Sequence, residues 1–243
     1  MEALRQYFGF SSFREGQQTL IDAVLAGRDV LGVMPTGGGK SLCYELPALL
    51  LPGLTLVISP LISLMKDQVM ALQNAGIPAG CIHSAMSVEE LREAYRDTRF
   101  GAYKILYIAP ERLLTDGFCA LAQELEISLL AVDEAHCISQ WGQDFRPSYL
   151  KILDFLQKLP RRPALAAFTA TATAQVRSDI VRILQLQDPV TVVTGFDRPN
   201  LRFEVLRPQD KRRALLELLE ERRDKSGIVY CATRKNVEEV CDF

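Results

Sequence analysis

The sequence predicts an α/β protein in which helices cover a parallel β-sheet. Short apolar runs rich in β-branched residues alternate along the chain with longer stretches of helical periodicity, a pattern typical of parallel strands joined by crossover helices. Of the 243 residues, 48% are hydrophobic and 24% are charged, which supplies a buried core and excludes disordered, collagen-like and coiled-coil classes. The length fits one large domain, or one complete domain and part of another.

The first part of the chain carries most of these alternations. Apolar runs predict strands at residues 29–34, 55–59, 80–83, 104–108, 128–132, 164–169 and 190–194. Helical periodicity predicts helices at residues 15–25, 40–50, 61–75, 87–99, 117–125, 149–159 and 173–184. Ser87 and Thr173 begin two of these helices with a hydroxyl group that caps free backbone N–H groups. We therefore expect residues 1–194 to form one complete α/β domain.

The alternation begins again after a turn-rich stretch at residues 195–200. It predicts strands at 201–206 and 227–231 and helices at 211–225 and 234–243. The first of these helices interleaves its basic residues with Glu217, Glu220 and Glu221, which indicates an exposed, salt-bridged face rather than a nucleic-acid patch. Because a parallel domain with two strands cannot bury its own sheet, we expect residues 195–243 to be the incomplete start of a second domain.

Charge, cysteine and hydropathy patterns exclude several classes of protein. The net charge of −2 excludes a strongly basic nucleic-acid binder but allows a local groove. The six cysteines form no C-x-x-C pair and the chain has two histidines, so we predict no zinc site. No apolar stretch approaches the ~20 residues of a membrane span, and the N-terminus has no cleavable leader. We expect an intracellular protein with no membrane partner.

A glycine-rich segment, MPTGGGKS at residues 34–41, lies between a predicted strand and a predicted helix. Glycines let successive backbone N–H groups point inward and form a nest for phosphates at a helix N-terminus. Lys40 would neutralise phosphate charge, and the Ser41 hydroxyl would bind Mg²⁺. The strict pattern has glycine where this chain has Met34, so a purely structural turn stays open as an alternative. The residues predicted to bind nucleotide phosphates are Thr36, Gly37, Gly38, Gly39, Lys40 and Ser41.

An acidic pair, Asp133 and Glu134, follows the predicted strand at 128–132. In nucleoside triphosphatases the first acid at such a strand end holds Mg²⁺, and the second polarises the attacking water. Taken alone, such a pair also reads as a turn or a helix cap. Since the glycine-rich segment and the acidic pair both follow strands, at the edge where parallel sheets bind ligands, we predict Lys40 and Glu134 as catalytic residues.

These segments resemble the superfamily 2 helicases and, among them, the RecQ family of ATP-dependent DNA helicases. The matching stretches, in the family's order, are residues 8–10, 13–17, 34–41, 59–68, 109–113, 133–149, 168–172, 196–200 and 227–231. The first two stretches and the tryptophan-containing segment at 137–147, here called the aromatic loop, are specific to RecQ proteins. The resemblance implies a RecA-like P-loop NTPase domain at residues 1–194, followed by the beginning of a second RecA-like domain at 195–243.

By the same resemblance, three residues near the N-terminus would bind the adenine of ATP. Gln17 would read the edge of the base with both faces of its amide, Arg14 would assist, and Phe10 would lie against the ring. The alternatives are a solvated helix start for the two polar residues and a core position for the aromatic one.

The aromatic loop offers Trp141, Phe145 and Arg146, which suit stacking on unpaired bases and contact with phosphate. RecQ proteins are similar here and use the loop to couple DNA binding to hydrolysis, although they commonly have histidine where this chain has Gln143. Alternatively, the aromatic side chains pin the loop to the core. Further strand contacts implied by the resemblance are Lys66, Gln68 and Arg112, each of which also reads as an ordinary exposed polar residue.

The resemblance implies an ATP-dependent 3′–5′ DNA helicase that acts in recombination and repair. Its cofactors would be ATP and Mg²⁺, the latter held by Ser41 and Asp133, and its partner would be DNA as single strands and duplex junctions. We expect a cytoplasmic, nucleoid-associated protein of bacterial type, with a monomer assumed.

The expected incompleteness of the second domain limits the activity predicted for this chain. RecQ-like helicases carry there an arginine that stabilises the transferring phosphate, and its loss typically removes ~10³–10⁵ in rate. We expect nucleotide binding, slow hydrolysis and no unwinding. The alternatives are a non-enzymatic nucleotide- and DNA-binding module, an RNA-directed superfamily 2 ATPase and, last, a small-molecule kinase.

Overall fold

The computed structural model describes residues 2–195 and 200–243. It divides the chain into two compact units, Met1–Phe196 and Asp197–Phe243. Of the stretch that resembles RecQ proteins at 196–200, residues 196–199 lie outside the described residues.

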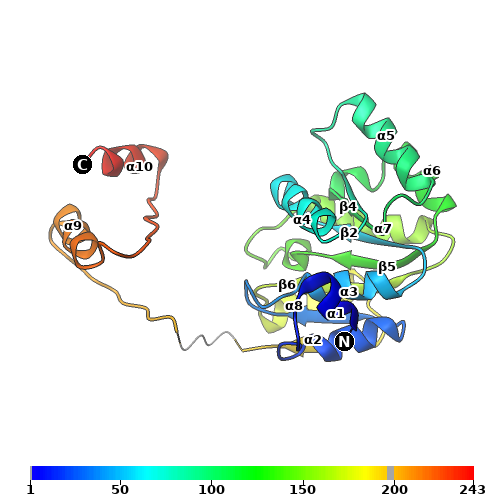
Figure 1. The fold of residues 1–243 in the computed structure, drawn as a ribbon, viewed down its shortest axis with the longest axis horizontal. Helices are drawn as coiled ribbons and strands as arrows, with labels where there is room; N and C mark the ends of the chain where they lie inside the picture. Colours follow the sequence, from blue (N-terminus) through cyan, green and yellow to red (C-terminus); the bar gives the residue numbers. More distant parts are fainter. Residues whose placement is uncertain (1, 196–199) are drawn as a thin grey trace. The chain divides into compact units, whose positions relative to one another are not determined.

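The first unit is built on a sheet of seven parallel strands in the order β3-β4-β2-β5-β6-β1-β7 (Figure 1). The strands are β1 Val30–Val33, β2 Leu54–Ile58, β3 Ala79–Ile82, β4 Ile105–Ile108, β5 Ile127–Val132, β6 Ala164–Thr169 and β7 Val190–Val193. Each strand predicted in this part of the chain is confirmed. The central strands are buried on both faces, as expected of a parallel sheet between helices.

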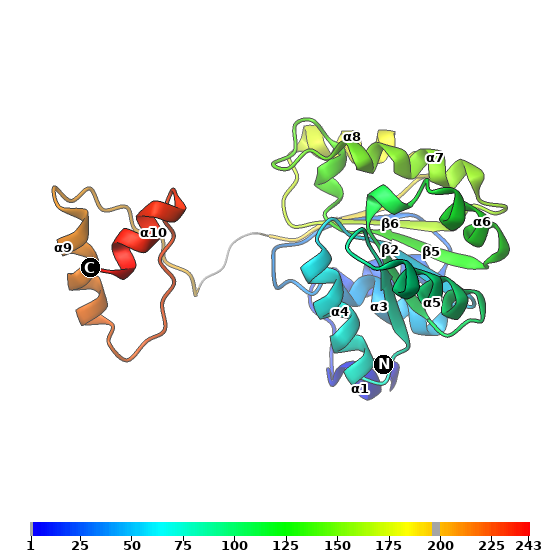
Figure 2. The ribbon, with the colours of Figure 1, turned by 90° about the horizontal axis from the view of Figure 1, so that it is seen from above.

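Helices cover both faces of the sheet. They are α1 Glu2–Phe8, α2 Gln17–Leu25, α3 Leu42–Leu50, α4 Ile62–Asn74, α5 Val88–Arg99, α6 Asp116–Glu124, α7 Lys151–Lys158 and α8 Ala174–Ile183. Helices α1 to α4 pack on one apolar cluster and α5 to α8 on another, and Figure 2 shows α3 and α4 on the opposite side of the sheet from α7 and α8. The predicted caps at Ser87 and Thr173 are confirmed, whereas α1 was not predicted.

The topology brings distant segments to one edge of the sheet. Strand β6 lies between β5 and β1, with Val132 opposite Ala167 and Val33 opposite Thr169. The glycine-rich segment leaves the carboxyl end of β1, and the acidic pair leaves the carboxyl end of β5. Both therefore emerge at the same edge, where open α/β sheets bind their ligands.

The second unit contains α9 Lys211–Glu221 and α10 Arg234–Cys241, capped by Asp210 and Thr233. Arg213 pairs with Glu217 at 3.1 Å on the exposed face of α9, in agreement with the predicted salt-bridged helix. The strand predictions at 201–206 and 227–231 are wrong in this structure, because these segments have no regular structure. A strand needs a neighbour for its backbone hydrogen bonds, and here Phe203 and Tyr230 are 91% and 90% exposed.

No helix in the described part of the chain combines the length and the apolar character required to cross a membrane.

Candidate functional site

A cavity of about 690 Å³ opens at the carboxyl edge of the sheet and gathers most of the predicted nucleotide site. The predicted residues that line it are Phe10, Arg14, Gln17, Thr36, Gly37, Gly39, Lys40, Ser41, Asp133 and Glu134. Gln68, predicted as a strand contact, also lines it, together with Gly9, Ser11, Ser12, Leu42 and Leu64, which were not predicted. Segments that are far apart in the sequence thus form one concave surface.

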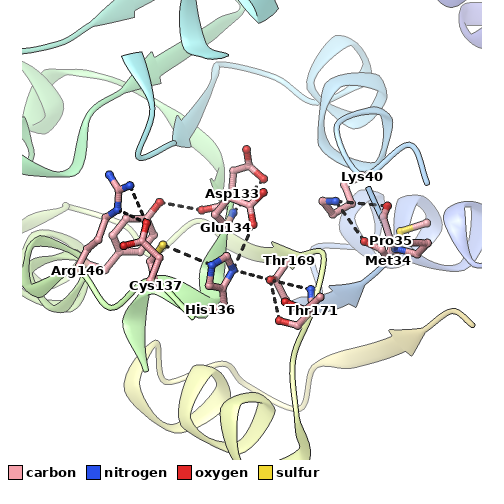
Figure 3. Close-up of polar contacts among 12 residues, drawn as sticks. Met34, Pro35, Lys40, Asp133, Glu134, His136, Cys137, Arg146, Thr169 and Thr171 are labelled. Atoms are coloured by element: carbon pink, nitrogen blue, oxygen red, sulfur yellow. Dashed lines mark hydrogen bonds and ion pairs between the residues drawn. The ribbon is translucent and has the colours of Figure 1, made fainter. Parts of the chain in front are cut away.

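The glycine-rich segment is a tight loop between β1 and α3. Gly39 has a φ of 80°, which favours glycine, and a Cβ atom there would displace the side-chain nitrogen of Gln17. The Lys40 Nζ lies 3.2 Å from the carbonyl oxygen of Met34 and 3.5 Å from that of Pro35, inside the curve of the loop (Figure 3). Met34 does not have a positive φ and its side chain is buried in the core, so the backbone at this position does not require glycine.

Gln17 joins the N-terminal segment to this loop. Its side chain is 2% exposed, its Oε1 accepts from the Arg14 N–H at 2.8 Å, and its Nε2 donates to the Gly39 carbonyl at 3.1 Å. The Arg14 guanidinium donates to the Gly37 carbonyl. Phe10 is 51% exposed at the cavity. Gln17 is therefore not a solvated helix start, and Phe10 is not a core aromatic.

The acidic pair occupies the end of β5 in a constrained backbone. Glu134 adopts a φ of 47°, uncommon for a residue with a side chain, and its N–H donates to Asp133 Oδ1 at 3.0 Å. The Tyr149 hydroxyl donates to the Asp133 carbonyl at 2.9 Å. Burial, and then the neighbouring Glu134 charge, raise the pKa of Asp133 to about 6. A nearby cation would stabilise the ionised form of a carboxylate in this position.

His136 links the acidic pair to β6 (Figure 3). Its Nδ1 lies 3.2 Å from Glu134 Oε2 and 2.8 Å from Thr169 Oγ1. Contact with the Cys137 thiol and the hydrogen bond with Glu134 raise the pKa of His136 to about 9, while the same bond lowers the pKa of Glu134. At neutral pH the two form an imidazolium–carboxylate pair. Sequence reasoning did not assign His136 or Thr169 to the site, although His136 stands beside the acidic pair.

The residues of the aromatic loop differ in exposure. The Trp141 side chain is 75% exposed, whereas Phe145 is half-buried. Arg146 Nη1 donates to the Pro60 carbonyl at 2.8 Å, and its Nη2 pairs with Asp144 at 2.7 Å. The alternative that both aromatic side chains pin the loop to the core therefore fails for Trp141.

Lys66 and Arg112 both lie close enough to His83 for their charges to affect its pKa. Lys66 is exposed on α4, and Arg112 is half-buried in the short helix η1, Pro110–Arg112. Burial, followed by the charge of Lys66, lowers the pKa of His83, with a smaller effect from Arg112. Among the described residues, His83 Nδ1 and Arg112 Nε are buried without a hydrogen-bond partner.

Ser41 and Asp133 supply a hydroxyl and a carboxylate oxygen to the cavity, the oxygen ligands that Mg²⁺ prefers in proteins. Within the described ranges, no three His, Cys, Asp or Glu side chains gather as a metal site. Magnesium in nucleotide sites is held by one or two protein groups and the substrate phosphates, so this sparse set of donors fits it.

Comparison with known proteins defines the class of this chain. Residues 14–180 match the family model of the DEAD/DEAH box helicases, and the chain belongs to this family. It is 49% identical over 238 residues to the ATP-dependent DNA helicase RecQ of Bacillus subtilis, covering 98% of this chain and 40% of that protein. It is 44% identical over 242 residues to the protein of the same name from Pasteurella multocida, covering 100% and 38% respectively. The predicted resemblance to RecQ helicases is confirmed, and the chain corresponds to the N-terminal portion of these relatives.

Solved structures show the same fold. The DUF1998 helicase MrfA bound to DNA and AMPPNP aligns with a TM-score of 0.73 at 18% identity, covering 98% of this chain and 36% of that one. A hypothetical ATP-dependent RNA helicase from Sulfolobus tokodaii aligns with a TM-score of 0.65 at 22% identity, covering 99% and 70%. The predicted α/β class with a RecA-like parallel sheet is confirmed.

Proposed function

We propose that the chain is the ATP- and DNA-binding part of a 3′–5′ DNA helicase of RecQ type that acts in recombination and repair. The observation that carries the proposal is the single cavity that unites Gln17, Lys40 and the acidic pair. The names of the bacterial relatives, which are ATP-dependent DNA helicases, support DNA as the substrate. With chromosomal DNA as substrate, the protein would work at the nucleoid.

ATP would bind with its base between Phe10 and the amide of Gln17, assisted by Arg14. Gln17 Nε2 donates one of its two N–H groups to the Gly39 carbonyl, and its Oε1 has a second lone pair beside the bond from Arg14, so both ends of the amide would read the base while the bond to the loop is kept. Base recognition would therefore be coupled to the conformation of the phosphate-binding loop.

The phosphates would be cradled by the N–H groups of residues 36–41, and the Lys40 ammonium would turn from the loop carbonyls to the phosphate oxygens. Mg²⁺ held by Ser41 and Asp133 would neutralise charge on the phosphates. Glu134 would accept a hydrogen bond from the attacking water, with its carboxylate oriented by His136 at 3.2 Å. The lowered pKa of Glu134 keeps it ionised for this role.

Single-stranded DNA would stack on Trp141 and Phe145 and contact Arg146, while Lys66 and Arg112 would contact its phosphates. Gln68, which faces the nucleotide cavity, would join the two sites rather than contact DNA alone. The aromatic loop directly follows Glu134. Ordering of the loop by DNA would therefore change the position of Glu134 relative to the hydrolytic water. Gln143 in place of the family's usual histidine would alter the strength of this coupling.

We further propose that residues 1–194 are the first RecA-like domain and that residues 195–243 belong to the second. The described residues of the second unit form two helices and no strand. Hydrolysis by this 243-residue chain would be slow, and it would not unwind duplex DNA.

The test is to measure binding of a fluorescent ATP analogue and hydrolysis of ATP, with single-stranded DNA or RNA as competitor at stated salt. We expect Mg²⁺-dependent binding, slow hydrolysis that Glu134→Gln abolishes, and preference for DNA. Lack of nucleotide binding would contradict the proposal. A preference for RNA would favour an RNA-directed ATPase, and hydrolysis unaffected by Glu134→Gln would remove that residue from its proposed role. Fast DNA-stimulated hydrolysis would contradict the proposed slow rate.

A further inference from the structure

A hydrogen-bonded relay connects the aromatic loop to helix α8. Ser139, at the base of the loop, is fully buried, and its Oγ donates to Asp179 Oδ2 at 2.7 Å. The same oxygen accepts from the backbone N–H of Trp141 at 3.1 Å. Asp179 lies on α8, forty residues further along the chain, and is 7% exposed.

The charge on Asp179 gives this relay a fixed direction. Hydrogen bonds from Arg182 and then from Ser139 lower the pKa of Asp179, so the group is a carboxylate at neutral pH and can only accept. The single hydroxyl hydrogen of Ser139 is therefore committed to Asp179, and the lone pairs of its oxygen face the Trp141 N–H. The backbone of Trp141 is held although its side chain is 75% exposed.

The residue after Trp141 shows how closely the anchored loop packs on the segment that follows Glu134. A Cβ atom at Gly142 would overlap the His136 carbonyl and lie 3.1 Å from that of Ser139. The backbone at Trp141 and Gly142 is therefore a tight turn, bonded to Ser139 and closed against the carbonyls of His136 and Ser139. An exposed aromatic ring on a fixed backbone is suited to stacking, because little conformational freedom is lost on binding.

We propose that Asp179 is a positioning residue, which through Ser139 holds the backbone of Trp141 so that the indole is presented to an unpaired base. This inference rests on the proposed function, since it assumes that the aromatic loop binds single-stranded DNA. It extends the DNA-binding machinery to a helix that touches neither the nucleotide cavity nor the exposed face of the loop.

Trp141 is the one tryptophan of the chain, so tryptophan fluorescence, excited where tyrosine does not absorb, reports on this loop alone. We would measure time-resolved fluorescence anisotropy of the free 243-residue chain, its affinity for a single-stranded oligonucleotide, and its affinity for a fluorescent ATP analogue. The variants are Asp179→Ala and Ser139→Ala, with Asp179→Asn as the conservative change whose amide oxygen still accepts from Ser139. Arg182→Ala is the matched control, because it removes the ion-pair partner of Asp179 at an exposed side chain.

Both alanine variants should show faster local motion of Trp141 and about threefold or greater loss of DNA affinity, with ATP-analogue affinity unchanged. Asp179→Asn and Arg182→Ala should resemble the wild type. A folded Asp179→Ala chain with wild-type Trp141 motion would overturn the anchoring, and unchanged or tighter DNA binding would overturn its role in presentation. Failure of the wild-type chain to bind DNA would instead refute the proposed function, while Trp141 motion in the free variants would still decide whether Asp179 anchors the loop.

Discussion

Glu45 provides a quantitative test of the environment immediately behind the nucleotide cavity. It lies on α3, one turn after the phosphate-binding loop, and is 6% exposed. The Tyr107 hydroxyl donates to its Oε1 at 3.1 Å. Burial raises the pKa of Glu45 from 4.5 to about 7, only partly offset by the bond from Tyr107. The folded protein therefore retains a proton that the unfolded chain has already released.

The sign and size of the effect follow from linkage between proton binding and folding. Between pH 4.5 and about 7 the folded state binds more protons, so the free energy of unfolding falls as the pH rises. Each pH unit in that window corresponds to ~1.4 kcal/mol, which gives a loss of about 2 to 3 kcal/mol between about pH 5 and about pH 8. Glu45→Gln keeps an acceptor for Tyr107 and removes the titration, so this loss should disappear.

The assay is urea unfolding of the wild type and Glu45→Gln at both pH values, followed by circular dichroism and Trp141 fluorescence. Relative to the wild type, Glu45→Gln should gain about 2 to 3 kcal/mol on going from acid to alkaline pH. Glu89→Gln, an identical change at an exposed site on α5, is the control and should show no such gain. An equal stability difference between Glu45→Gln and the wild type at the two pH values would refute the reasoning.

Three further outcomes test the site directly. Lys40→Ala should weaken binding of Mg·ATP about tenfold or more, measured by calorimetry, because charge-assisted hydrogen bonds to phosphate contribute ~1.5–3 kcal/mol; unchanged affinity would remove Lys40 from the site. Gln17→Ala should make the affinities for ATP and GTP equal, which competition against a fluorescent analogue measures; a preserved preference would show that another group reads the base. Trp141→Ala should weaken binding of single-stranded DNA by ~1–3 kcal/mol, measured by anisotropy of a labelled oligonucleotide, with nucleotide affinity unchanged; an unaltered DNA affinity would contradict stacking on this ring.

The sequence pattern was sufficient to predict the parallel sheet and the residues that follow the ends of its strands. Hydrophobic periodicity is a local property, and it identifies the strands. Lys40 and Asp133 come shortly after two of these strands in the sequence. Because carboxyl ends of parallel strands share one edge, the two segments could be placed together before their contacts were known. The local pattern did not place Gln17 in the site, because its contact with Gly39 depends on tertiary structure. Its predicted role came from the resemblance to a family.

Features that depend on strand order or on partners were not predictable from the local pattern. The bond between His136 and Thr169 requires β6 to lie beside β5, and that between Ser139 and Asp179 requires α8 to pack under the aromatic loop. Gln68, predicted as a strand contact, also lines the nucleotide cavity from α4, which the local pattern did not indicate. The segment at 227–231 has the composition of a strand, yet it pairs with no strand among the described residues of the second unit.

The central claim is that one cavity binds ATP, with the base read by Gln17 and the phosphates held by the loop around Lys40. The most direct measurement is displacement of a fluorescent ATP analogue from the wild-type chain by ATP and by GTP in the presence of Mg²⁺. The account predicts that ATP displaces the analogue at least about tenfold more effectively than GTP, because the amide of Gln17 pairs with adenine and mismatches guanine. Equal displacement by the two nucleotides, or no binding of the analogue at all, would contradict it.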